Sequence, residues 1–134
     1  MKYLLDSNTC IHYLRHGAKS PVAGKLSATN PGDVALCSVV LGELLFGALR
    51  SSDPAKNTAQ VRTFAGGFPS LPYEDNAAGR YADIRADLAA KGTPIGPNDM
   101  LIAAIALAQG LTLVTHNTNE FRRVNGLSLD DWQI

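Results

Sequence analysis

The chain has 134 residues, of which 46% are hydrophobic, and its 12 basic and 12 acidic side chains give a net charge of zero. That length predicts a single domain over residues 1–134, and the lack of an apolar run of roughly 18 residues excludes a membrane-spanning helix. The neutral balance also excludes a nonspecific electrostatic grip on nucleic acid, so any such contact requires a local basic patch.

The start of the chain indicates where the protein works. The run Tyr3-Leu4-Leu5 is followed at once by Asp6, which makes the apolar stretch too short for a signal peptide. We therefore expect a cytoplasmic protein. The two cysteines, Cys10 and Cys37, lack the spacing of a metal or redox motif and are expected to be reduced, packed thiols.

The first part of the chain predicts short strands that alternate with helices. In chain order, the predicted elements are a strand at residues 2–6, a helix at 8–16, a helix from Pro21 to about Ala28, a turn at 30–33 and a strand at 34–37. The two helices are indicated by Ile11 and Leu14 at helical spacing and by a proline suited to a first helical turn.

The middle of the chain continues the pattern. Ser38 is predicted to cap a helix over residues 39–50, and Asp53-Pro54 is predicted to open another that ends near Gly66. Apolar positions nearly encircle the first of these helices, so most are expected in the core and some at a protein interface: Val40, Leu41, Leu44, Leu45 and Phe46. Residues 71–73 predict a weak strand.

The last part of the chain contains the clearest helix stops. A helix capped by Asp75 or Asn76 is predicted to run to Lys91 and to stop at Gly92. A helix at 99–109 closed by Gly110 and a strand at 111–115 follow. The rest is predicted as a loop at 117–123 with room for one helical turn, and a final strand at 127–133. The whole pattern predicts an α/β fold with a central, mainly parallel sheet flanked by helices.

Three carboxylates stand alone in apolar or neutral surroundings: Asp6, Glu43 and Asp99. Acids of this kind are seldom buried without a partner, because the unpaired charge is costly. Simpler roles remain open, since Asp6 and Asp99 could cap the helices that follow them and Glu43 could pair with Arg50. In a parallel sheet, however, all three could meet at the carboxyl edge, where ligands bind.

Clustered carboxylates repel one another, and a bound divalent cation removes that conflict. A ligand set made only of oxygen favours Mg²⁺ or Mn²⁺, which most often serve phosphate chemistry. Asn117 and Glu120 follow the last apolar strand and are candidates for a fourth ligand, although Asn117 could simply form a turn. Ser7, Asn8 and Thr115 are candidates to hydrogen-bond the acids or a phosphate.

The sequence resembles the PIN-domain ribonucleases, and in particular the VapC-type toxins of toxin–antitoxin pairs. The resemblance covers nearly the whole chain and rests on three stretches in order: "YLLDSNTCIHYL", "SVVLGELLFGALRS" and "GPNDMLIAAIALAQGLTLVTHNTNEFRRVNGLSLDDW". It implies a PIN fold, an endoribonuclease dependent on Mg²⁺ or Mn²⁺, and structured RNA, often tRNA, as substrate. It also implies inhibition by a VapB-type antitoxin and a homodimer.

The resemblance also implies roles for particular residues. Asp6, Glu43 and Asp99 match the three core acids of the family, and the fourth position, often Asp, is Asn117 here. Glu120 is then expected to supply the missing charge. In the mechanism that we hypothesise, a metal-activated water cleaves the phosphodiester and leaves 5′-phosphate and 3′-hydroxyl ends.

Because the whole chain has no net charge, binding of RNA phosphates requires basic side chains near the site. Arg15, His16 and Lys19 follow the first strand–helix unit, and Arg122 and Arg123 lie beyond the site loop. Ordinary solvated surface charge is the alternative.

Three other functions are weighed against the nuclease. A haloacid-dehalogenase-like phosphatase would need an acid where Asn8 stands and a late lysine that the chain lacks. A metal-free ribonuclease would use His12, His16 and His116. A catalytically weak module that binds RNA or a partner would keep the acids as relics, and Asn117 leaves room for that interpretation.

Overall fold

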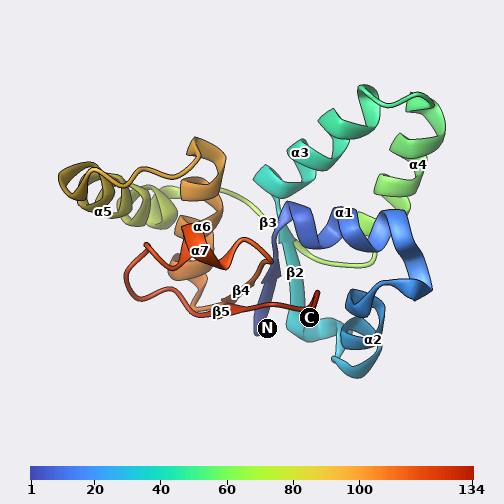
Figure 1. Cartoon of the computed structure of the whole chain (residues 1–134), viewed down its shortest axis with the longest axis horizontal. Helices are drawn as coiled ribbons and strands as arrows, with labels where there is room; N and C mark the ends of the chain where they lie inside the picture. Colours follow the sequence, from blue (N-terminus) through green and yellow to red (C-terminus); the bar gives the residue numbers. More distant parts are fainter.

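The computed structural model describes residues 1–134 as one parallel sheet flanked by helices (Figure 1). The strands are β1 (Tyr3–Leu5), β2 (Val34–Cys37), β3 (Ser70–Leu71), β4 (Thr112–Val114) and β5 (Leu129–Asp130). Their order in the sheet is β3-β2-β1-β4-β5, and every neighbouring pair is parallel. The predicted α/β fold is confirmed.

The helices pack on both sides of the sheet. They are α1 (Ser7–His16), α2 (Pro21–Ala28), α3 (Ser38–Leu49), α4 (Pro54–Ala65), α5 (Asp75–Lys91), α6 (Pro97–Gln109) and the short α7 (Thr118–Phe121), with 3₁₀ turns at Gly17–Lys19 and Pro31–Asp33. In Figure 1, α5 and α6 lie on one side of the strands and α1 and α2 on the other. The hairpin of α3 and α4 extends beyond the carboxyl ends of the strands.

Strand β1 is the centre of the sheet. Leu4 pairs with Ala35 of β2 on one side and with Leu113 of β4 on the other, and all three side chains are fully buried. The chain builds outward from β1 to β2 and β3 and then returns to the opposite side of β1 for β4. That reversal makes the carboxyl ends of β1 and β4 the topological switch point of the sheet, which is where ligands bind in open α/β sheets.

Several helix boundaries follow the local signals in the sequence. The Asp53 side chain accepts a hydrogen bond of 3.2 Å from the backbone nitrogen of Lys56, so Asp53 caps α4. Gly92 and Gly110 both adopt a φ of +67°, a left-handed conformation that ends α5 and α6. These predicted starts and stops are confirmed.

Other boundaries were predicted wrongly. Ser38 is the first residue of α3 rather than its N-cap, a position held by Cys37, and the Ser38 hydroxyl instead donates to the Leu71 carbonyl at 3.5 Å. Strand β3 covers only Ser70–Leu71, because Pro72 has no backbone N–H to extend the ladder. The predicted final strand is present, but it covers only Leu129–Asp130 of residues 127–133.

The N-terminus of α5 also differs from the prediction. Glu74 holds the N-cap position without a side-chain bond, and Asp75 is the first residue of the helix. The Asn76 side chain accepts a bond of 2.8 Å from the backbone nitrogen of Ala77 inside the first turn.

Burial divides the apolar face of α3 into two groups. Val40 and Leu44 are buried in the core, whereas the side chains of Phe46 and Leu49 are 61% and 64% exposed.

Cys10 and Cys37 are free, buried thiols, as predicted. None of the helices combines the length and the apolar composition that crossing a membrane requires.

Candidate active site

Asp6 lies at the carboxyl end of β1 and is only 3% exposed. One of its carboxylate oxygens, Oδ1, accepts a hydrogen bond of 2.8 Å from the backbone nitrogen of Ser7 at the start of α1. The other, Oδ2, accepts one of 2.8 Å from the hydroxyl of Thr115, which follows β4. Asp6 therefore caps α1, as the simpler interpretation held, and is also tied to the neighbouring strand.

The charge of Asp6 has no cation opposite it. Burial raises the pKa of Asp6, the bonds from Thr115 and Ser7 act in the opposite direction, and the nearby charge of Glu43 adds to the rise. The ion pairs of the chain all lie elsewhere. Burying an ionised carboxylate without a positive partner costs roughly several kcal/mol. The site therefore favours a bound cation.

Glu43 lies in the second turn of α3 and faces α1. Its Oε1 accepts a hydrogen bond of 2.6 Å from the Ser7 hydroxyl, which links α3 to the end of β1. The alternative pair with Arg50 is not formed, because the Arg50 guanidinium lies 5.6 Å from the centre of the Phe46 ring instead. One turn beyond Glu43, Gly47 leaves open space at a hollow of about 320 Å³.

Asp99 lies in the first turn of α6, whose N-cap position is held by Gly96. Its pKa is raised to about 6, first by burial and then by the charges of Asp6, Glu43 and Glu120. The three acids predicted from isolation in the sequence therefore lie near enough to act on one another electrostatically. A Cβ on Gly96 would approach the Asp99 carboxylate to 3.3 Å, so the glycine leaves room for that group.

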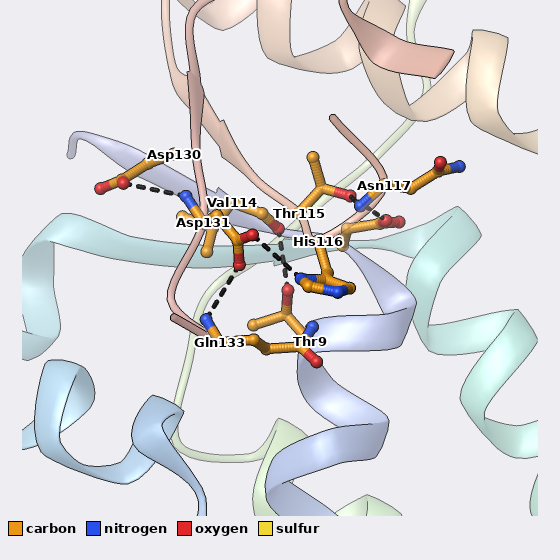
Figure 2. A network of polar contacts seen from close by, with 9 residues as sticks. Thr9, Val114, Thr115, His116, Asn117, Asp130, Asp131 and Gln133 are labelled. Carbon is orange, nitrogen blue, oxygen red and sulfur yellow. Dashed lines mark hydrogen bonds and ion pairs between the residues drawn. The ribbon is translucent and has the colours of Figure 1, made fainter. Parts of the chain in front are cut away.

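Asn117 and Glu120 complete the rim of the site after β4. The backbone nitrogen of Asn117 donates to the Thr115 hydroxyl at 3.0 Å, a contact that Figure 2 shows as a dashed line. The Asn117 amide nitrogen donates to Glu120 Oε2 at 3.1 Å. The two candidates for the fourth position are thus hydrogen-bonded to each other. The side-chain carbonyl oxygen of Asn117 and the second carboxylate oxygen of Glu120 remain available for a ligand.

The chemistry of these donors fits a hard divalent cation. The site offers carboxylate, amide and hydroxyl oxygens, which suit Mg²⁺ or Mn²⁺ rather than zinc. Cys37 contributes no thiolate, because burial raises its pKa to about 11. The side chains do not form a ready-made arrangement of three acidic, histidine or cysteine ligands, and Glu43 and Glu120 are hydrogen-bonded to Ser7 and Asn117.

The five predicted basic residues are all exposed. They are Arg15, His16, Lys19, Arg122 and Arg123. Arg15 lines the hollow next to Glu43, and the Arg123 guanidinium donates to the Pro94 carbonyl at 3.2 Å. Asn8 is exposed in the first turn of α1.

Sequence reasoning missed one part of the site. Gln133, almost at the end of the chain, lines a second hollow together with Asn8 and Asn117. Its backbone nitrogen donates to the Asp131 carboxylate at 2.9 Å, and that carboxylate also contacts His116 at 2.9 Å (Figure 2). A glutamine three residues beyond a weak edge strand carries no motif, so no signal in the sequence could have placed it here.

Comparison with known proteins gives a consistent result. The family described as "PIN domain" matches residues 3–127. The chain is 39% identical, over 98% of both proteins, to the tRNA(fMet)-specific endonuclease VapC of Shigella flexneri, and 32% identical over the same share to Ribonuclease VapC2 of Rickettsia felis.

Solved structures agree with the sequence relatives. The DNA-bound VapBC complex of Salmonella typhimurium superimposes with a TM-score of 0.93 at 38% identity, over 98% of both chains. VapBC2 of Rickettsia felis, bound to a fragment of promoter DNA, gives 0.90 at 31% identity over 98% of this chain and 99% of that one. The phosphatase alternative is therefore wrong.

Proposed function

The chain belongs to the PIN-domain family as a VapC-type endoribonuclease, and on that premise we propose that it hydrolyses structured RNA, in particular tRNA, with a divalent metal ion. PIN-domain nucleases generally depend on such ions. The observation that carries the proposal is the buried Asp6 carboxylate, which lies close enough to Glu43 and Asp99 for their charges to interact and which forms no ion pair. We propose that residues 1–134 act as one ribonuclease domain.

Each acid then has a role. We propose that Asp6 and Asp99 hold Mg²⁺ or Mn²⁺, and that Glu43, Asn117 and Glu120 complete the shell or orient it. The bound ion would neutralise charge on the scissile phosphate and make water a stronger nucleophile.

The surrounding hydroxyls keep these side chains in place. Thr115 and the Ser7 backbone fix both oxygens of Asp6, so that the carboxylate cannot rotate away. The Ser7 hydroxyl occupies Oε1 of Glu43, which leaves Oε2 to accept a proton or a hydrogen bond from the attacking water. The expected products carry 5′-phosphate and 3′-hydroxyl ends.

Binding of the RNA backbone is assigned to the exposed bases. Arg15 lines the hollow beside Glu43, Lys19 follows α1, and Arg122 and Arg123 follow α7. Since the protein as a whole is neutral, these local charges must neutralise the phosphates that flank the cut.

Two protein partners are proposed. The similar structures from Salmonella and Rickettsia are VapBC complexes, which supports a VapB-type antitoxin as partner. We also propose a homodimer, and the exposed Phe46 and Leu49 of α3 are side chains available for such contacts. The predicted cytoplasmic location is consistent with an RNA substrate.

Incubation of the purified protein with tRNA, with and without Mg²⁺, Mn²⁺ and a chelator, tests the activity. We expect chelator-sensitive cleavage that leaves 5′-phosphate ends, and no cleavage by Asp6→Ala or Asp99→Ala. Chelator-resistant cleavage that leaves cyclic phosphate would instead favour catalysis by His12, His16 and His116. RNA binding without turnover would favour the catalytically weak binding module.

A further inference from the structure

A second hollow, of about 420 Å³, opens beside the acidic site between α1 and the segments that follow β4 and β5. Its volume lies in the range of about 300–1,000 Å³ typical of ligand pockets. Apart from Ile11, its lining is polar, and it contains all three histidines of the chain. The polar lining includes Asn8, His12, Arg15, His16, His116 and Asn117.

The three histidine side chains line this hollow. His12 and His16 are one helical turn apart on α1, and their ring centres are 4.5 Å apart. The Nδ1 of His12 contacts the Ser20 hydroxyl at 2.7 Å, and the Nδ1 of His116 contacts Asp131 at 2.9 Å (Figure 2). Both rings are therefore fixed in orientation, and the opposite ring nitrogen of each remains for a ligand.

Other polar groups in the hollow also lack partners. The Gln133 side-chain nitrogen is buried and makes no hydrogen bond, and a buried donor of this kind costs about 1–3 kcal/mol unless an acceptor arrives. Arg15 is exposed at the same wall and adds a positive charge. A ligand with both acceptor atoms and negative charge would satisfy these two groups.

The hollow and the acidic site share a wall. Asn8 follows Ser7, whose backbone and hydroxyl bind Asp6 and Glu43. On the other side, Asn117 is bonded to Thr115 and Glu120. A strand of RNA that places its scissile phosphate at the acids would therefore bring an adjoining nucleotide into the hollow.

We propose that this hollow is a subsite for an unpaired nucleotide next to the cleaved bond, with its base stacked on His12 and His16 and its phosphate at Arg15. The proposal rests on the proposed ribonuclease function. Single-stranded RNA bases are commonly bound in this way, by stacking on flat side chains and by amide contacts to their edges. The polar lining does not suit the apolar face of a partner helix.

Imidazole signals in an NMR spectrum test the binding directly, because each histidine of the chain lines the hollow. A short single-stranded RNA of mixed sequence, added with chelator so that it stays intact, should shift all three signals. The same RNA should shift them much less in Arg15→Ala. The matched control is Arg62→Ala, which removes an exposed arginine of α4 outside the hollow and should leave the RNA-induced shifts as in the unmodified protein.

A cleavage assay with abasic substrates locates the nucleotide. Removal of one base at the position that occupies the hollow should slow cleavage by the unmodified protein about tenfold. In His16→Ala that same removal should matter little, because the stacking partner is already lost. Equal rates for all abasic substrates with the unmodified protein would overturn the proposal.

The outcomes distinguish a failure of the ribonuclease function from a failure of the nucleotide subsite. If no RNA is cleaved but the imidazole signals shift, the ribonuclease function fails and the binding hollow stands. If tRNA is cleaved but RNA leaves the imidazole signals unmoved, the subsite is wrong. Signals that move with a bound antitoxin protein and not with RNA would assign the hollow to that partner and likewise overturn the proposal.

Discussion

The hydroxyl of Thr115 donates to Asp6 at 2.8 Å across 109 residues of sequence. It joins the ends of β1 and β4 and fixes the oxygen of a buried acid. Because this bond favours the charged form of Asp6, it partly offsets the effect of burial on its pKa. In the proposed metal site, the bond would therefore help to keep Asp6 charged for a cation.

Replacing Thr115 by valine should weaken the site without unfolding the chain. The change keeps the shape but removes the donor to Asp6, so we expect Mg²⁺ affinity and tRNA cleavage to fall about 10- to 100-fold. The matched control is Thr9→Val, because the buried Thr9 hydroxyl donates only to the Val114 carbonyl, at 3.2 Å (Figure 2). Metal titration followed by cleavage assays measures both variants, and equal losses would contradict a specific role for Thr115.

Asp99→Asn should reduce cleavage without lowering the stability of the metal-free protein. The amide removes one charge that repels Asp6, Glu43 and Glu120, so the free energy of unfolding of the metal-free protein should rise or stay level. Cleavage should fall by about a thousandfold or more, because the proposed metal ligand loses its charge.

Chemical denaturation with and without Mg²⁺ tests whether Asp99 destabilises the metal-free protein and whether it binds the ion. The free energy of unfolding of the unmodified protein should rise by roughly 2.7 kcal/mol when the ion is present at about a hundred times its Kd. The rise in Asp99→Asn should be much smaller. Asp83→Asn, an exposed acid on α5, is the control and should behave as the unmodified protein. A metal-free Asp99→Asn that unfolds far more easily would contradict the predicted repulsion.

The metal-free protein should lose stability as pH rises through the acidic range. The pKa of Asp99 is raised from 3.8 to about 6 in the folded state, so the folded chain binds more protons than the unfolded chain between these values. The stabilising contribution is then full below about pH 4 and is lost as pH rises through 6. The raised pKa of Asp6 acts in the same direction.

Unfolding curves in chelator at a series of pH values measure this effect. Asp99→Asn should show a flatter dependence between pH 4 and pH 7, roughly the interval set by the folded and unfolded values. Mg²⁺ should act oppositely, because it competes with the proton for the same oxygens, so its stabilising effect should grow with pH. Identical slopes for the two proteins would show that Asp99 is not perturbed.

Two glycines of α5 should respond oppositely to alanine. Gly79 lies inside the helix, and an added Cβ would meet no atom within 4 Å, so Gly79→Ala should raise the free energy of unfolding by about 0.5–1 kcal/mol. Gly92 ends the helix at a φ of +67°, so Gly92→Ala should lower it by about 1 kcal/mol. Thermal unfolding in chelator compares the pair, and changes of the same sign would contradict the backbone argument.

The features that the sequence predicted well are those set by local chemistry or by topology. Gly92, Gly110 and Asp53-Pro54 mark helix ends because their backbone preferences act wherever they stand. The short runs of β1, β2 and β4 are apolar because both faces of the sheet are covered.

The approach of Asp6, Glu43 and Asp99 followed from one rule, that the carboxyl ends of parallel strands share an edge. The features that escaped prediction depend on side-chain placement or on weak edge pairing. Strands β3 and β5 each have two residues and one neighbour, too few to leave a pattern. The bonds from Ser7 to Glu43 and from Asn117 to Glu120 depend on how the helices approach one another, which no local pattern encodes.

The position of β4 late in the chain limits when the nuclease can become active during its own synthesis. Asp6 emerges from the ribosome early, yet its partner Thr115 and the rim residues Asn117 and Glu120 are among the last to be made. Until then β1 has an open edge where β4 will pair. If the proposed site is the catalytic one, a growing chain should not cleave RNA until residues 115–120 have been translated.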